Sequence, residues 1–188
     1  MERNSGYIRS FIAAVPPDEV VVKLEEYMNK LKTFTDFKWV EPQQIHVTLR
    51  FLGDSEAAQI QKVDTALSRI GGVGSFLIGT KAAGAFPSLE RPNVLWLGIG
   101  SGVKELDKLA SRVEQAARSA DYAPESRRFR AHLTLARKKK EGDMPPELKK
   151  LLQQAPRFEW CCDSFVLMKS VLMPSGPEYT KLGTYSLG

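Results

Sequence analysis

Apolar residues recur along the chain with two different periods, and this alternation predicts a mixed α+β fold. Short apolar runs typical of strands occupy 6–15, 45–52, 76–81, 93–99 and 129–136, with one or two closing strands in 158–172. Apolar positions at helical spacing lie between them, in 18–31, 60–70, 101–120 and 145–154. We expect Pro16 and Pro17 to open the first helix. We expect Gly53, Asp54 and Ser55 to end the second strand and cap the second helix.

The predicted elements follow the order β-α-β-α-β twice in 188 residues. The third element of each copy contains His-x-Thr-Leu, and the spacing that leads to it is nearly equal. Ile12 precedes His46 by 34 residues, and Leu97 precedes His132 by 35. This repetition predicts a duplicated, two-lobed fold with pseudo-two-fold symmetry. Because no Pro/Gly/Ser-rich linker separates the copies, we expect residues 1–188 to form a single domain.

The chain has two histidines, and both belong to the repeated tetrapeptide, at 46–49 and 132–135. Residues i and i+2 of a strand face the same side, so each motif presents an imidazole beside a threonine hydroxyl. An imidazole exchanges a proton near neutral pH, and a hydroxyl can donate to a phosphate oxygen. Two such motifs around one phosphorus suit in-line displacement with one base and one acid, without a metal. The structural alternative is a pair of hydrogen-bonded core histidines.

The net charge of +5 and a pI of about 9.2 indicate an anionic partner. Seven basic residues and no acidic one lie in 127–140, either as a phosphate or nucleic-acid footprint or, for Lys138 to Lys140, as a solvated surface. Cys161 and Cys162 are adjacent, and no spaced Cys/His set predicts a metal site. No apolar run approaches a membrane-spanning length, so we expect a cytoplasmic protein.

The paired motifs resemble the signatures of the 2H phosphoesterase superfamily. Further segments resemble its RNA 2′,3′-cyclic phosphodiesterase branch, which is also called 2′-5′ RNA ligase-like. These segments are Arg9–Ala13, His46–Gly53, Phe86–Pro87, Val94–Leu97 and His132–Arg137, with Ser170, Gly176 and Tyr179 near the end of the chain. The resemblance spans nearly the whole chain. It implies a LigT-like α+β fold in which antiparallel sheets face a central cleft, helices lie outside, and both chain ends share one lobe.

The resemblance also implies roles for five residues. His46 matches the general acid toward the leaving ribose oxygen, and His132 matches the histidine that activates water. Thr48 and Thr134 match the phosphate-binding threonines. Arg137 matches the arginine that closes the second motif, near the phosphate or the water. No cofactor is implied, and we expect a monomer.

Two expectations depend on local geometry. Arg137 lies three residues beyond Thr134, so a straight strand would turn it away from the threonine's face. It reaches the site if the chain bends after Leu135 or if its side chain folds back. Phe86 or Trp96 could stack on an RNA base, although core packing is the competing role for both.

We therefore expect metal-independent hydrolysis of RNA 2′,3′-cyclic phosphate ends to a 2′-phosphomonoester, whose reverse direction would join RNA ends through a 2′-5′ bond without ATP. A related phosphodiesterase acting on 2′-5′ oligonucleotides or small cyclic nucleotides is one alternative. A non-catalytic module that binds RNA or nucleotides is another. Retention of both histidines argues against the binding module, because binding alone could use arginine or lysine.

Overall fold

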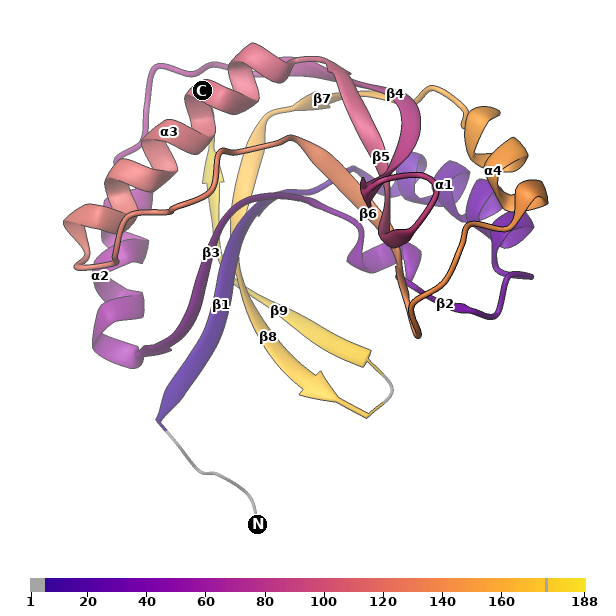
Figure 1. Cartoon of the computed structure of the whole chain (residues 1–188). Helices are drawn as coiled ribbons and strands as arrows, with labels where there is room; N and C mark the ends of the chain where they lie inside the picture. Colours follow the sequence, from indigo (N-terminus) through magenta and orange to yellow (C-terminus); the bar gives the residue numbers. More distant parts are fainter. Residues whose placement is uncertain (1–5, 175) are drawn as a thin grey trace.

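A computed structural model describes residues 6–174 and 176–188 of the chain (Figure 1). Its strands are β1 (Tyr7–Ala14), β2 (Phe37–Trp39), β3 (Val47–Glu56), β4 (Phe76–Pro87), β5 (Pro92–Ser101), β6 (His132–Lys138), β7 (Glu159–Cys162), β8 (Ser164–Met173) and β9 (Gly176–Ser186). Its helices are α1 (Asp18–Leu31), α2 (Ala57–Leu67), α3 (Val103–Ser119) and α4 (Pro146–Gln153), with a 3₁₀ turn, η1, at Pro42–Gln44.

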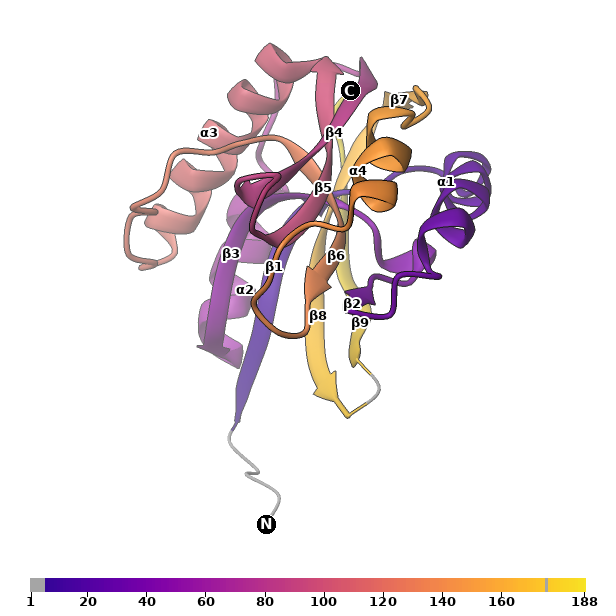
Figure 2. The same cartoon turned by 45° about the vertical axis from the view of Figure 1, so that its right-hand side comes forward.

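All strands belong to one antiparallel sheet, in the order β7-β4-β5-β6-β3-β1-β8-β9, with β2 added beside β6. The sheet curls, and the helices lie on its outer side (Figures 1 and 2). One lobe holds β1, β3, β8 and β9 with α2 and α3, and the other holds β4 to β7 with α1 and α4. The predicted two-lobed α+β fold is confirmed, and the first and last strands share a lobe.

The two halves of the sheet meet at the β3–β6 pair, where Val47 is the Cα partner of Leu133. Both side chains are fully buried in the main core cluster. They are the residues between the histidine and the threonine of each motif. The alternation of a strand therefore sends Val47 and Leu133 into the core, and sends the motif histidines and threonines to the opposite face.

Three features of the sheet differ from the sequence-based expectations, one of them the short strand β2, which had no predicted counterpart. The prediction that Gly53 to Ser55 end a strand and cap α2 is wrong: β3 continues to Glu56, the residue before α2, which makes no side-chain capping bond. Gly53 adopts a φ of 74°, and the β1–β3 register shifts beside it, so the strand absorbs the irregularity and continues. The hairpin strand β9 had no predicted counterpart, because most of its residues are exposed and its polar and apolar positions do not alternate.

The joining of the two lobes gives a stability prediction. Leu133→Ala removes a fully buried side chain at the β3–β6 junction and should reduce the free energy of unfolding by about 2–5 kcal/mol. Leu182→Ala, on β9 and 40% exposed, is the matched control and should change it by no more than about 0.5 kcal/mol. Urea unfolding followed by circular dichroism measures both. Equal effects of the two substitutions would contradict the assigned junction.

Candidate active site

His46 lies immediately before β3, two residues after the 3₁₀ turn that ends at Gln44. Its ring nitrogen Nδ1 is 2.7 Å from the Gln44 carbonyl oxygen. A carbonyl can only accept, so Nδ1 carries the proton and donates it. The other nitrogen, Nε2, is therefore available to exchange a proton with a ligand.

His132 repeats this arrangement at the start of β6. Its Nδ1 donates to the Arg130 carbonyl oxygen, again two residues earlier in the chain and again at 2.7 Å. Both imidazoles are thus held in the same orientation by the same local backbone bond. A buried core histidine needs partners for both nitrogens, whereas here Nε2 of each ring has no protein partner among the described residues.

The junction of the two lobes brings the motifs together. Because β3 and β6 run antiparallel, the Val47–Leu133 pair is flanked by His46 and Thr134 on one side and by Thr48 and His132 on the other. Each histidine therefore lies beside the threonine of the opposite motif. The shared site predicted from the duplication has this geometry, with two imidazoles and two hydroxyls around one local two-fold axis.

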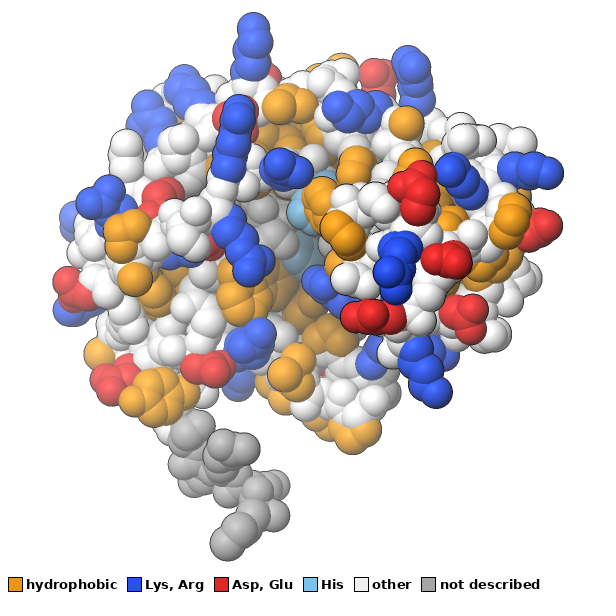
Figure 3. Space-filling view, in the orientation of Figure 1, with side chains coloured by type: hydrophobic (Ala, Val, Ile, Leu, Met, Phe, Trp, Pro, Cys, Tyr) orange, Lys and Arg blue, Asp and Glu red, His pale blue; other side chains and the backbone are white. Residues whose placement is uncertain are grey.

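The motifs line a cleft with two arms. The His46 arm has a volume of about 740 Å³, and the His132 arm has a volume of about 810 Å³. Four residues line both arms, so the arms are continuous: Thr48, Phe51, Thr134 and Arg137. Figure 3 shows the histidines at the bottom of a hollow between the lobes, with Lys and Arg side chains on its rim.

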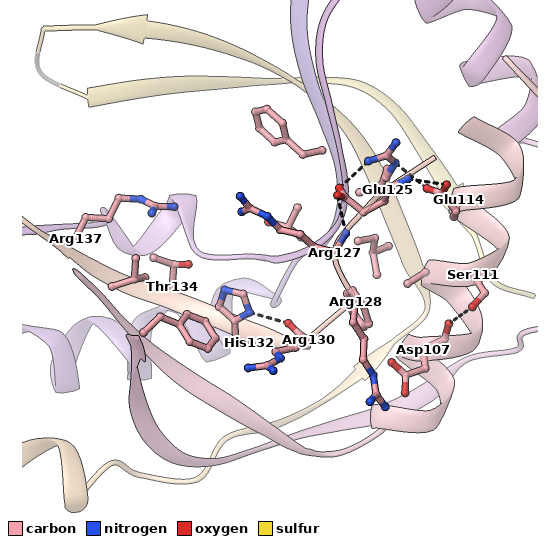
Figure 4. A pocket seen from close by; sticks show the side chains of 18 residues that line it. Asp107, Ser111, Glu114, Glu125, Arg127, Arg128, Arg130, His132, Thr134 and Arg137 are labelled. Atoms are coloured by element: carbon pink, nitrogen blue, oxygen red, sulfur yellow. Dashed lines mark hydrogen bonds and ion pairs between the residues drawn. The ribbon is translucent and has the colours of Figure 1, made fainter. Parts of the chain in front are cut away.

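A β-bulge explains how Arg137 reaches the cleft. In the β5–β6 pairing, Trp96 faces Thr134 but Leu95 faces Ala136, so Leu135 is the extra residue. The bulge reverses the alternation and returns Arg137 to the face of Thr134, where it lines the cleft (Figure 4). Arg137 therefore reaches the cleft because the chain bends at Leu135, and its side chain does not need to fold back.

The first motif has the equivalent bulge. Ile12 of β1 faces Arg50 and Ala13 faces Thr48, so Leu49 is skipped as Leu135 is. The residue that this bulge turns into the cleft is Phe51, which stands five positions after its histidine, as Arg137 does. The backbone, the histidines and the threonines therefore follow the two-fold symmetry. The symmetry breaks at the next cleft-facing position, which is the aromatic Phe51 in one motif and Arg137 in the other.

Aromatic rings enclose both imidazoles. Phe11 stacks on His46 with ring centroids 4.6 Å apart, and Tyr179 presents its edge at 5.6 Å. On the other side, Phe86 meets His132 edge-on at 5.4 Å and lines the His132 arm. Trp96 lines neither arm of the cleft. Its ring packs directly over Gly84, where a Cβ atom would collide with it, and lies 6.5 Å from the His132 ring. Trp96 therefore belongs to the wall behind His132.

These surroundings lower the pKa of both histidines. Burial lowers the pKa of His46 below its ordinary 6.5; the Gln44 carbonyl opposes this, and the charge of His132 adds to it. Burial likewise lowers the pKa of His132, against the Arg130 carbonyl and together with the Arg137 guanidinium. Both imidazoles consequently favour the neutral form more than a solvated histidine does.

The basic run at 127–140 separates into two groups. Four of its arginines line the His132 arm: Arg127, Arg128, Arg130 and Arg137. Lys138 instead donates to the carbonyl oxygens of Gly142 and Asp143. Lys139 and Lys140 are exposed and line neither arm. The lysines thus fit the solvated-surface alternative, and the arginines face the cleft.

Several residues that line the cleft were missed from the sequence as site residues, Phe51 and Arg50 among them. Phe51 reaches the cleft because of the bulge at Leu49, and the residue types around Leu49 do not predict a bulge there. Arg50 lies beneath the His132 arm and forms ion pairs with Glu114 and Glu125, which are distant in sequence. An alignment of the two copies of the repeat could have found Phe51, because it stands five residues after His46 as Arg137 stands five residues after His132.

Among the described residues, no three His, Cys, Asp or Glu side chains gather as a metal-binding group. None of the helices in this part of the chain has the length and apolar character of a membrane-spanning helix.

Comparisons with known proteins agree with this geometry. The family model described as 2′-5′ RNA ligase superfamily matches residues 16–172. An RNA 2′,3′-cyclic phosphodiesterase of Aeropyrum pernix is 35% identical, covering 80% of this chain and 86% of the relative. The Aquifex aeolicus protein of the same name is 34% identical, covering 88% and 92%.

The fold has solved counterparts. The crystal structure of E. coli LigT in apo form superposes with a TM-score of 0.78 at 22% identity, covering 97% of this chain and 99% of that one. The same protein has also been solved in complex with 3′-AMP. A family model that matches most of the chain, and that coincides with two equivalent histidine motifs on one cleft, settles the assignment: the chain belongs to the 2′-5′ RNA ligase superfamily.

Proposed function

We propose that the protein hydrolyses RNA 2′,3′-cyclic phosphate ends to 2′-phosphomonoesters, with His46 and His132 as its acid and base. One observation carries the proposal: the two imidazoles, oriented by identical backbone bonds, flank a single strand pair together with two threonine hydroxyls. The relatives named RNA 2′,3′-cyclic phosphodiesterase support the same substrate class.

In the proposed reaction, His132 takes a proton from water as the water oxygen bonds to phosphorus. The bond from phosphorus to the ribose 3′ oxygen breaks, and His46 gives its proton to that oxygen. Thr48, Thr134 and Arg137 donate to the phosphoryl oxygens, whose negative charge grows in the transition state. With a 5′-hydroxyl in place of water, the same steps would form a 2′-5′ bond.

The choice of His46 as acid follows the family resemblance. The pKa shifts do not separate the two roles, because burial is the largest cause that lowers the pKa of both imidazoles. Phe86, half-buried and edge-on to His132, is proposed as a contact to the substrate.

The proposal extends to the organisation of the protein. Residues 1–188 are proposed to act as one two-lobed domain, since each lobe supplies one histidine and one threonine. A monomer is proposed because the site is complete within one chain. We propose that the protein acts in the cytoplasm.

The product of the reaction tests the function. We expect an RNA oligomer ending in a 2′,3′-cyclic phosphate to be opened to a 2′-phosphate in the presence of EDTA, because the acid, the base and the charge-stabilising donors are all side chains. Mass spectrometry with phosphatase and alkaline-stability controls identifies the product. Loss of activity in EDTA with recovery on adding a divalent ion would contradict the mechanism. Tight binding without turnover would favour the binding module.

Removal of either imidazole tests the two roles. His46→Ala and His132→Ala should each reduce kcat by about 100-fold or more, the contribution typical of a positioned acid or base. The double variant should lose much less than the product of the two single effects, because the groups act as a unit. The melting temperature serves as the control and should change little, since each ring faces the cleft. A large fall in melting temperature would instead support core histidines.

The lowered pKa values predict the pH profile. Catalysis needs one protonated and one neutral imidazole, and this state is most populated between the two pKa values, both below 6.5. We therefore expect kcat/KM to peak below pH 6.5 and to fall as the pH rises further, because the acid has lost its proton. The chain has no other histidine to confuse the assignment. A kcat/KM that still rises above about pH 8 would contradict the roles.

A further inference from the structure

The loop between α3 and β6, residues 120–131, forms one wall of the His132 arm. Three of its arginines line the arm and are exposed: Arg127, Arg128 and Arg130. None of the three side chains has an ion-pair partner among the described residues. In Figure 4, Arg130 lies beside His132, Arg127 extends over the cleft on the side of Arg137, and Arg128 points outward along α3. The cationic groups are thus distributed along the arm.

Arg50 anchors this loop. Its side chain is only 9% exposed, and its guanidinium lies 2.8 Å from the Glu114 carboxylate and 2.7 Å from that of Glu125. The guanidinium also donates to the Ala123 carbonyl oxygen. Glu125 in turn accepts the backbone N–H of Arg127. Two of the three acidic side chains that line the arm are therefore engaged with Arg50, and the third, Asp107, lies on α3. The three loop arginines outnumber this one carboxylate, so the arm keeps a net positive charge for a ligand.

The His46 arm has a different chemical character. Aromatic and apolar side chains line much of it, including Phe11, Trp39 and Tyr179. Its own cationic side chains are Arg9, which lies 3.9 Å from Asp54, and Lys38, and its acidic ones are Glu41 and Glu178. A nucleoside suits the aromatic walls. The phosphates of a longer substrate are favoured in the other arm, where three arginines lack an ion-pair partner among the described residues.

We propose that the His132 arm binds the phosphates of the RNA nucleotides that precede the cyclic end, with Arg127 and Arg128 as the specificity-determining contacts. The inference rests on the proposed function and narrows its substrate class to oligonucleotide ends, in preference to free cyclic mononucleotides. The planar fork of arginine suits phosphate oxygens. The contacts read the backbone of a single strand, so they carry no base preference.

Two substrates separate the contribution of the RNA chain from the chemistry at the cyclic end. We would measure kcat/KM for adenosine 2′,3′-cyclic phosphate and for a short RNA oligomer with the same cyclic end. Arg127→Gln/Arg128→Gln should lower the ratio of oligomer to mononucleotide kcat/KM by about tenfold or more. It should also reduce the slope of log kcat/KM against log salt for the oligomer by about 1.4, for two lost phosphate contacts on a single strand.

Matched variants control for charge and folding. Lys139→Gln/Lys140→Gln removes the same charge from the same basic run, outside the cleft, and should leave the ratio and the slope unchanged. Arg127→Lys/Arg128→Lys keeps the charge and should retain most of the slope. Melting temperatures show whether each variant is folded.

The outcomes distinguish the two proposals. A ratio unchanged by Arg127→Gln/Arg128→Gln, or lowered equally by the lysine variant, would overturn the phosphate-binding arm and leave the proposed function standing. Wild-type protein that hydrolyses neither substrate would overturn the proposed function, and the inference with it.

Discussion

The antiparallel pairing of Val47 with Leu133 is the contact on which the site depends. It joins two lobes that are otherwise built from different strands and helices. Because the paired residues stand between a histidine and a threonine in each strand, the register of this one pair decides which side chains meet. A slip of either strand by one residue would bury that strand's imidazole and turn its intervening apolar residue into the cleft. The fold and the chemistry are therefore specified by the same contact.

Symmetry supplies two equivalent imidazoles, but acid–base catalysis needs two different ones. The asymmetry enters directly after the motifs, where matching bulges at Leu49 and Leu135 present Phe51 on one side and Arg137 on the other. The arms continue the difference, since one is walled by aromatic rings and the other by arginines. A duplicated scaffold can thus present aromatic walls for a nucleoside on one side of a shared phosphate position and arginines for further phosphates on the other.

Much of this architecture could be predicted from the sequence because periodicity and spacing carry it. The four helices, the repeated order and the convergence of the two motifs follow from apolar patterning and from the equal distances to His46 and His132. The strand β9 escaped prediction because an exposed edge strand has no apolar period. The positions of Phe51 and Arg137 depend on bulges, which arise from pairing between strands. The anchoring of the loop by Arg50 depends on ion pairs across 64 and 75 residues of sequence, so the role of Arg127 and Arg128 could not be assigned beyond their charge.

Both motifs are proposed to act on a single phosphorus atom, and a crystal structure of the protein with bound phosphate or vanadate can show whether they do. We expect one anion at the junction of the arms, with Nε2 of His46 and of His132 and the hydroxyls of Thr48 and Thr134 all at hydrogen-bonding distances of about 2.6–3.2 Å. An anion bound by one motif alone, with the other histidine turned away from it, would contradict the shared site.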